Sequence, residues 1–198
     1  MQLISRFYLP FHHYLDKTKV AEGLAPLALR LYLAPIMIQA GYNKYVGFEG
    51  VVEWFSYLGF ILPSVMAFLA MVTELVGGIL ILIGLATRWV SIPLMITMLV
   101  AAFSVHWQNG WLAIADGSSW LANDNVIAAQ EKLAMAKSIL QEYGNYDWLT
   151  SSGSFVILNN GIEFAITYFI MFLVLFFYGG GRYVSIDYWL ARKFINSP

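Results

Sequence analysis

Four long apolar stretches constrain this chain more than any other feature of its sequence. Each is close to the roughly 20 residues that an α-helix needs to cross about 30 Å of hydrocarbon. They lie at about residues 24–42, 63–86, 89–107 and 157–178. We therefore predict an all-α polytopic membrane protein, a four-transmembrane-helix bundle that forms a single domain over residues 1–198. The segment of about 108–156 is predicted to be a helical insertion on the outer face.

The composition agrees with lipid around much of the protein surface. Of the 198 residues, 60% are hydrophobic and 12% are charged, whereas a soluble domain carries about 25% charged residues. The formal net charge is −1, so there is no excess of positive charge that would indicate nucleic-acid binding. The absence of cysteine excludes a thiol redox pair and a thiolate metal site.

Lysine and arginine are distributed unevenly between the two sides of the predicted bundle. If both termini are cytoplasmic, three of these residues fall in the outer segments and one, Arg30, lies within a span. The inner segments then hold seven, which are Arg6, Lys17, Lys19, Arg88, Arg182, Arg192 and Lys193. Positive residues are in excess on the cytoplasmic side of membrane proteins, so we predict that both termini are cytoplasmic.

Ionisable residues within the apolar stretches are the first functional candidates. Charges in hydrocarbon are costly, so they usually face a bundle interior, pair with each other or line a cavity. Arg30 lies in the first span; Glu74 lies in the second, on one face with Ala70 and Gly77. Small residues let membrane helices approach closely, so Glu74 is predicted to lie in a tight seam. We predict an Arg30–Glu74 pair, whose role is either structural or functional.

A second set of polar residues lies toward the outer ends of the spans. Four of them are predicted to converge on one outer pocket: Lys44, His106, Asn160 and Glu163. Glu163 and His106 are the catalytic candidates, because burial tunes the proton affinity of a carboxylate and of an imidazole. The predicted polar interior of the bundle comprises Arg30, Lys44, Glu74 and Asn160.

The third span also carries candidates for a metal site. Met95 and Met98 share a helical face with His106, and soft thioether ligands are typical of copper(I). A methionine in a helix seam is more often a packing residue, so both interpretations stay open. His106 is the one histidine within a predicted span, so haem ligation by two histidines of one chain is not expected.

The predicted outer insertion is acidic and contains its own helix. Its apolar residues recur every three or four positions, at Val126, Ala129, Leu133, Ala136, Leu140 and Tyr143. Gly144 is a plausible end for this helix. The insertion is interpreted either as a folded loop over the bundle or as a lid that gates a substrate.

Several short motifs, taken in order, resemble the DoxX family. They are Arg30, Ala40-Gly41-Tyr42-Asn43-Lys44, Glu74-Leu75-Val76-Gly77-Gly78, Gly84, His106, Glu163 and Gly179-Gly180-Gly181-Arg182-Tyr183-Val184-Ser185-Ile186-Asp187. The resemblance implies a four-helix protein of the bacterial inner membrane. It also implies that Arg30, Lys44, Glu74 and Glu163 belong to the family pattern.

The predicted insertion resembles one subgroup, the HvfX-type proteins, more closely. The residues that carry this likeness are His106-Trp107-Gln108-Asn109-Gly110-Trp111-Leu112-Ala113-Ile114-Ala115 and Asn145-Tyr146-Asp147-Trp148-Leu149. That subgroup is associated with the maturation of copper-binding modified peptides. Other members of the family are linked to membrane redox complexes.

Two hypotheses of function follow from these resemblances. In the first, the chain is an accessory protein for the maturation or handling of a copper-binding modified peptide. In the second, it is a subunit of a quinone-linked membrane oxidoreductase, and Glu163 and His106 exchange protons with the quinone head group. Quinone and copper are the candidate cofactors. Membrane lipids, a copper-binding peptide and another membrane protein are the candidate partners.

Overall fold

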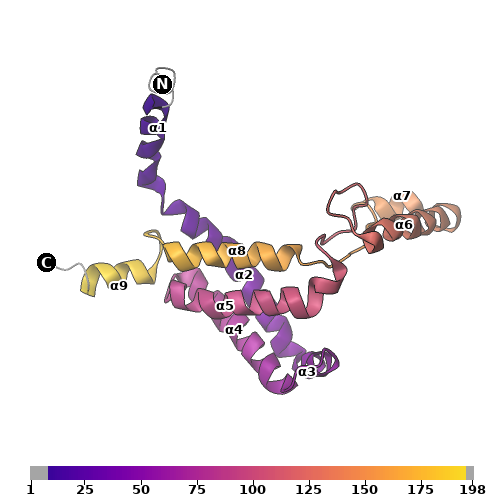
Figure 1. The fold of residues 1–198 in the computed structure, drawn as a ribbon, viewed down its shortest axis with the longest axis horizontal. Helices are drawn as coiled ribbons and strands as arrows, with labels where there is room; N and C mark the ends of the chain where they lie inside the picture. The colour runs from indigo at the N-terminus through magenta and orange to yellow at the C-terminus, as the bar shows by residue number, and fades with distance from the viewer. Residues whose placement is uncertain (1–8, 195–198) are drawn as a thin grey trace. The chain divides into compact units, whose positions relative to one another are not determined.

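The computed structural model describes residues 9–194, and every regular element in this range is a helix (Figure 1). The chain divides into two compact units, one of Met1–Met95 with Ile170–Pro198 and one of Ile96–Phe169. In the described range, three helical stretches are long and apolar enough to cross a membrane: Leu24–Val46, Pro63–Ile83 and Thr87–Asn109. The prediction of an all-α membrane protein is therefore confirmed.

Helices α2 (Leu24–Val46) and α4 (Pro63–Ile83) form the central pair of the first unit. Glycines bring their backbones together: Gly41 lies against the backbone of Leu75, and a Cβ added at Gly78 would lie 2.9 Å from the backbone nitrogen of Ile38. Any larger residue would force the helices apart, so this seam depends on small residues.

The turn between α4 and α5 (Thr87–Val100) lies slightly earlier than predicted. Gly84 ends α4 in the left-handed conformation with φ of 65°, and Ala86 also has a positive φ of 52°. The turn is held from outside, because the Asp187 carboxylate accepts hydrogen bonds from the backbone N–H groups of Ala86 and Thr87. A carboxylate in this position caps the start of α5.

A short helix, α3 (Phe48–Tyr57), fills part of the connection between α2 and α4 and was not predicted. Phe55 is its buried residue and stacks on Phe60, with ring centroids 4.9 Å apart. Pro63 then begins α4 at a position where its missing N–H is harmless.

The second unit contains the end of the third apolar stretch and the insertion. A π-helix, η3 (Ala101–His106), and a 3-10 turn, η4 (Trp107–Asn109), follow α5. Two more helices follow, α6 (Asp124–Tyr143) and α7 (Tyr146–Thr150). The core of this unit consists of Ala115, Val126 and Ala129, with Leu112, Ala122 and Ile157 packed against them.

The predicted helix of the insertion is present as α6, and it ends before Gly144 as predicted. Its predicted apolar face is buried only in the first half. Val126 and Ala129 are buried, whereas Ala136 and Tyr143 are exposed.

Helix α8 (Glu163–Tyr178) begins six residues later than the predicted start of the fourth span at 157. The reason is a set of backbone hydrogen bonds to a distant segment. The N–H groups of residues 159–163 donate to carbonyls of residues 110–113, and Asn160 adopts a positive φ of 58°. At 16 residues, α8 is about 24 Å long, shorter than the hydrocarbon thickness.

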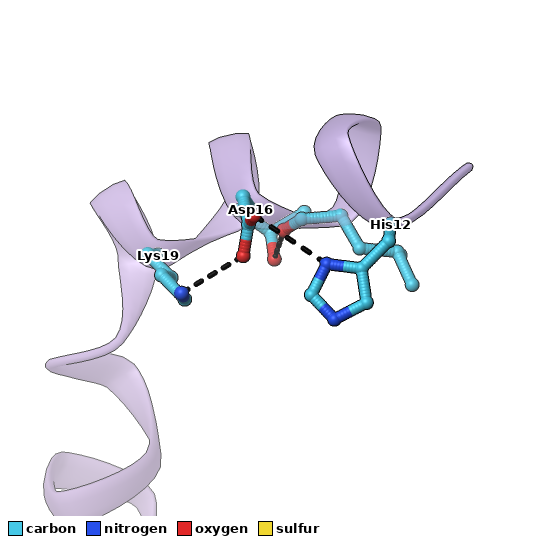
Figure 2. A network of polar contacts seen from close by, with 5 residues as sticks. His12, Asp16 and Lys19 are labelled. Carbon is cyan, nitrogen blue, oxygen red and sulfur yellow. Dashed lines mark hydrogen bonds and ion pairs between the residues drawn. The ribbon is translucent and has the colours of Figure 1, made fainter. Parts of the chain in front are cut away.

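Both ends of the described chain carry short helices that contain charged residues. At the N-terminal end lie α1 (Leu9–Asp16) and the 3-10 turn η2 (Lys17–Ala21), where Asp16 lies between Lys19 and His12 (Figure 2). The hydrogen bond from Lys19 lowers the pKa of Asp16 below its ordinary value. At the other end, α9 (Ile186–Phe194) combines exposed aromatics with Arg192 and Lys193, as helices at a membrane surface do.

Candidate functional site

A buried ion pair joins α2 and α4. Lys44 Nζ donates to Glu74 Oε2 at 2.5 Å, with 5% of the Glu74 side chain and 22% of the Lys44 side chain exposed. Glu74 lies near the middle of α4, beside the buried Gly77 and Gly78, so its predicted place in a tight seam is confirmed. It is about 14 Å along the helix axis from Ile83 at the end of α4.

Arg30 does not pair with Glu74, so that prediction is wrong. The fully buried guanidinium instead donates to five backbone carbonyls, those of Ile81, Leu82, Gly180, Tyr183 and Val184, at 2.7–3.2 Å. We call this set the arginine cluster. A guanidinium has five N–H groups, and each is satisfied here by a carbonyl dipole. The side chain therefore reaches toward the ends of α4 and α8, away from Glu74.

The segment that follows α8 completes the arginine cluster. Asp187 N donates to the Gly84 carbonyl at 2.8 Å, and Ser185 Oγ donates to the same carbonyl at 3.2 Å. Gly84 cannot carry a side chain, because a Cβ would lie 2.7 Å from the guanidinium carbon of Arg30. The motif from Gly179 to Asp187 therefore ties the C-terminal segment to the α4–α5 turn.

A second polar cluster lies in the unit of Ile96–Phe169. His106 Nδ1 and Asn109 Nδ2 both lie within hydrogen-bond distance of the Asn160 carbonyl, at 2.9 and 3.0 Å. We call these three residues the histidine cluster. A carbonyl oxygen can only accept, so Nδ1 must carry the hydrogen, and neutral His106 then has its lone pair on Nε2. In the described part of the chain, Nε2 has no hydrogen-bond partner.

The backbone is irregular at both His106 and Asn160. His106 ends the π-helix η3, a form that is frequent at functional sites, and Asn160 is left-handed. A non-glycine residue in the left-handed conformation persists where the surroundings fix it. Here Asn159 Nδ2 contributes, since it donates to the carbonyls of Asn109 and Leu112 at 2.8 and 2.6 Å.

Glu163 anchors the start of α8 in the same unit. Its Oε2 accepts a hydrogen bond from the backbone N–H of Ala113 at 2.9 Å. A carboxylate in the first turn of a helix also interacts favourably with the helix dipole. Glu163 therefore has a structural contact that its position in the sequence did not reveal.

The predicted site residues are thus distributed over separate contacts. Lys44 pairs with Glu74, and Asn160 is exposed and takes part through its backbone carbonyl, not its side chain. Met98 is buried and Met95 is half-buried. Among residues 9–194, no group of three or more His, Cys, Asp or Glu side chains is placed to hold a metal ion.

Sequence reasoning missed the roles of Ser185 and Asp187. Ser185, just before α9, is a recognisable helix cap, and its Oγ accepts a hydrogen bond from the Tyr188 N–H at 3.4 Å. Asp187, in the first turn of α9, instead caps the start of α5, 100 residues earlier in the chain, so its role could not be identified from the sequence.

Helices of membrane-spanning length, joined by a buried ion pair, define an integral membrane protein with a polar interior. The DoxX family model matches residues 25–107. Over 93 residues the chain is 37% identical to "Putative oxidoreductase CatD" of Bacillus subtilis (strain 168). The aligned segment makes up 47% of this chain and 68% of that protein. The chain belongs to the DoxX family.

A second relative is named as an inner membrane protein. Over 68 residues the chain is 35% identical to "Inner membrane protein YphA" of Escherichia coli (strain K12). The aligned segment makes up 34% of this chain and 49% of that protein. The chain thus spans about half the length of this relative. No solved structure matches the chain.

Proposed function

We propose that this protein is a subunit of a quinone-linked redox system of the inner membrane, and that His106 exchanges a proton with the quinone head group. The observation that carries this proposal is the geometry of His106. Its Nδ1–H is held by the Asn160 carbonyl, and its Nε2 has no partner among the described residues. A ring oriented in this way is suited to accept or donate a proton at Nε2.

The redox chemistry of a quinone involves proton transfer, which a side chain such as His106 can carry out. Reduction of a quinone to a quinol takes up two electrons and two protons, and oxidation releases them. In this proposal a partner redox protein supplies or removes the electrons, and His106 transfers one of the protons. His106 lies near the end of the apolar stretch Thr87–Asn109, close to where a membrane-dissolved head group meets water. The relative named as a putative oxidoreductase supports this choice.

A pair of substitutions tests the proposal. His106→Asn keeps an amide N–H near the place of Nδ1 and removes Nε2, whereas His106→Gln places its amide near Nε2 and loses the donor to Asn160. We expect the purified protein to bind a short-chain benzoquinone, and His106→Asn to weaken that binding about tenfold with little change in thermal unfolding. Binding would be measured by equilibrium dialysis in detergent. A wild-type protein that binds no benzoquinone would refute the proposal.

The accessory role for a copper-binding modified peptide is the second candidate. One observation favours it, because a neutral imidazole nitrogen without a partner is also a good copper ligand. No group of three His, Cys, Asp or Glu side chains is placed to hold a metal in the described range, so the peptide would supply most ligands. Copper-loaded peptide that binds the wild-type protein but not His106→Asn, without any benzoquinone binding, would favour this candidate.

We also propose that α8 is a fourth span and that both termini are cytoplasmic. The excess of lysine and arginine in the segments assigned to the cytoplasm supports this orientation. The cysteine-free sequence allows a direct test by single substitutions. In intact spheroplasts, an impermeant maleimide is expected to label Ser152→Cys but not Lys193→Cys, both of which are exposed positions. Labelling of both variants, or of Lys193→Cys alone, would contradict the topology.

A further inference from the structure

An open concavity of about 350 Å³, with both polar and apolar lining residues, lies in the first unit, where the start of α5 meets the end of α8 and the start of α9. It is lined by Arg88 and Trp89, by Tyr178 and the turn of residues 179–181, and by Asp187 and Tyr188. We call it the Arg88 pocket. Its lining contains neither Lys44 nor Glu74, and no residue of the histidine cluster.

Arg88 has most of its hydrogen-bonding capacity available. Its Nη2 donates to the Phe177 carbonyl at 2.6 Å, and the side chain is otherwise exposed. Of its five N–H groups, four have no acceptor among the described residues. This contrasts with Arg30, whose five N–H groups are all satisfied.

Backbone N–H groups add to the positive character of the Arg88 pocket. Asp187 caps the N–H groups of Ala86 and Thr87 at the start of α5, but the N–H groups of Arg88 and Trp89 in the same turn donate to no such cap in the described chain. Gly179 and Gly181 are left-handed, with φ of 71° and 70°. The Gly179 N–H donates to the Leu175 carbonyl at 2.7 Å, whereas the N–H groups of Gly180 and Gly181 have no backbone acceptor in the described chain. Successive free N–H groups in a left-handed turn can bind an anion.

The acidic group in the lining is already engaged. Both carboxylate oxygens of Asp187 accept backbone N–H groups, those of Ala86 and Thr87, at 2.6 and 2.8 Å. Its charge is therefore directed toward the start of α5, and the N–H groups of Arg88 that have no protein acceptor are accessible to an anion.

The surroundings of the pocket are those of a membrane surface. The pocket lies at the ends of apolar helices, and Trp89 and Tyr178 are 77% and 74% exposed. Tryptophan and tyrosine are enriched where the headgroups of a bilayer lie. We propose that the Arg88 pocket binds the phosphate of an anionic phospholipid, with the guanidinium and the glycine turn as its donors.

Titration with lipid in mixed micelles tests this assignment. The full chain, purified in a neutral detergent, would be titrated with phosphatidylglycerol or phosphatidylcholine of the same chain length, and lipid retention would be measured by native mass spectrometry. We expect selective retention of phosphatidylglycerol, weakened about fivefold by Arg88→Gln. Arg192→Gln is the matched control, because Arg192 is an exposed arginine of α9 that does not line the pocket.

Three results would overturn the assignment. They are equal retention of both lipids by the wild-type protein, equal retention of phosphatidylglycerol by Arg88→Gln and wild type, and displacement of the lipid by an excess of inorganic phosphate. The last would identify a site for a free anion.

Hydrogen exchange on the wild-type protein keeps the proposal testable if Arg88→Gln does not fold. Phosphatidylglycerol, but not phosphatidylcholine, is then expected to slow exchange at residues 88–89 and 179–181, and unchanged exchange there would refute the proposal.

Discussion

Arg30→Ala is expected to remove most of the folded protein from the membrane. The substitution removes the guanidinium from five carbonyls of the arginine cluster, of which the Ile81 carbonyl keeps the Gly84 N–H, and opens a cavity where the buried side chain lay. Each buried polar group without a partner costs about 1–3 kcal/mol, so we expect a loss of at least about 4 kcal/mol. A protein has only about 5–15 kcal/mol of stability to lose. The measurement is the yield of monodisperse protein in detergent and its unfolding temperature.

Two controls distinguish this account from a general effect of losing charge. Arg192→Ala, at an exposed position, is expected to change stability by less than about 0.5 kcal/mol. Adding Glu74→Ala to Arg30→Ala is expected to give no rescue, because the two residues are not partners. Recovery of folded yield in that double variant would show that Arg30 and Glu74 are paired after all.

Lys44→Met is expected to destabilise the protein by about 3–5 kcal/mol, because it leaves the Glu74 carboxylate buried without its partner. Adding Glu74→Gln removes the uncompensated charge and is expected to recover most of this loss. Chemical unfolding in detergent of the wild type, both single variants and the double variant forms a double-mutant cycle. Additive losses in the double variant would mean that the two side chains do not interact.

The sequence predicted the helical stretches well, because long apolar runs report directly on burial in lipid. The small residues around Glu74 likewise predicted its seam, since helical spacing determines which residues share a face. The start of α8 was not predictable in the same way. It depends on backbone hydrogen bonds between residues 159–163 and 110–113, which are distant in the chain and have no side-chain pattern.

The partner of Arg30 could not be read from the sequence for a different physical reason. A buried charge suggests an opposite charge, and Glu74 was the nearest carboxylate in the helical pattern. The guanidinium is instead satisfied by carbonyl dipoles, which every residue possesses and which no sequence pattern marks. Three of these carbonyls belong to the segment after α8, about 150 residues from Arg30. The left-handed Gly84, which makes room for the side chain, becomes meaningful only once this contact is known.

His106 illustrates the same limit at the candidate site. Its position at the end of an apolar stretch was evident, but the π-helix that carries it and the carbonyl that orients it were not. Both depend on how residues 106–113 meet residues 159–163. The proposed proton exchange therefore depends on one geometric feature, the hydrogen bond between His106 Nδ1 and the Asn160 carbonyl.

Nitrogen-15 NMR of the imidazole in lipid bilayers tests that feature most directly. The chain has three histidines, so a variant with His12→Gln and His13→Gln leaves His106 as the sole labelled ring. When the ring is neutral, we predict a protonated Nδ1 and an unprotonated Nε2, and a change in the Nε2 signal when a short-chain benzoquinone is added. A neutral ring protonated at Nε2, or an Nε2 signal that does not respond to the benzoquinone, would contradict the account.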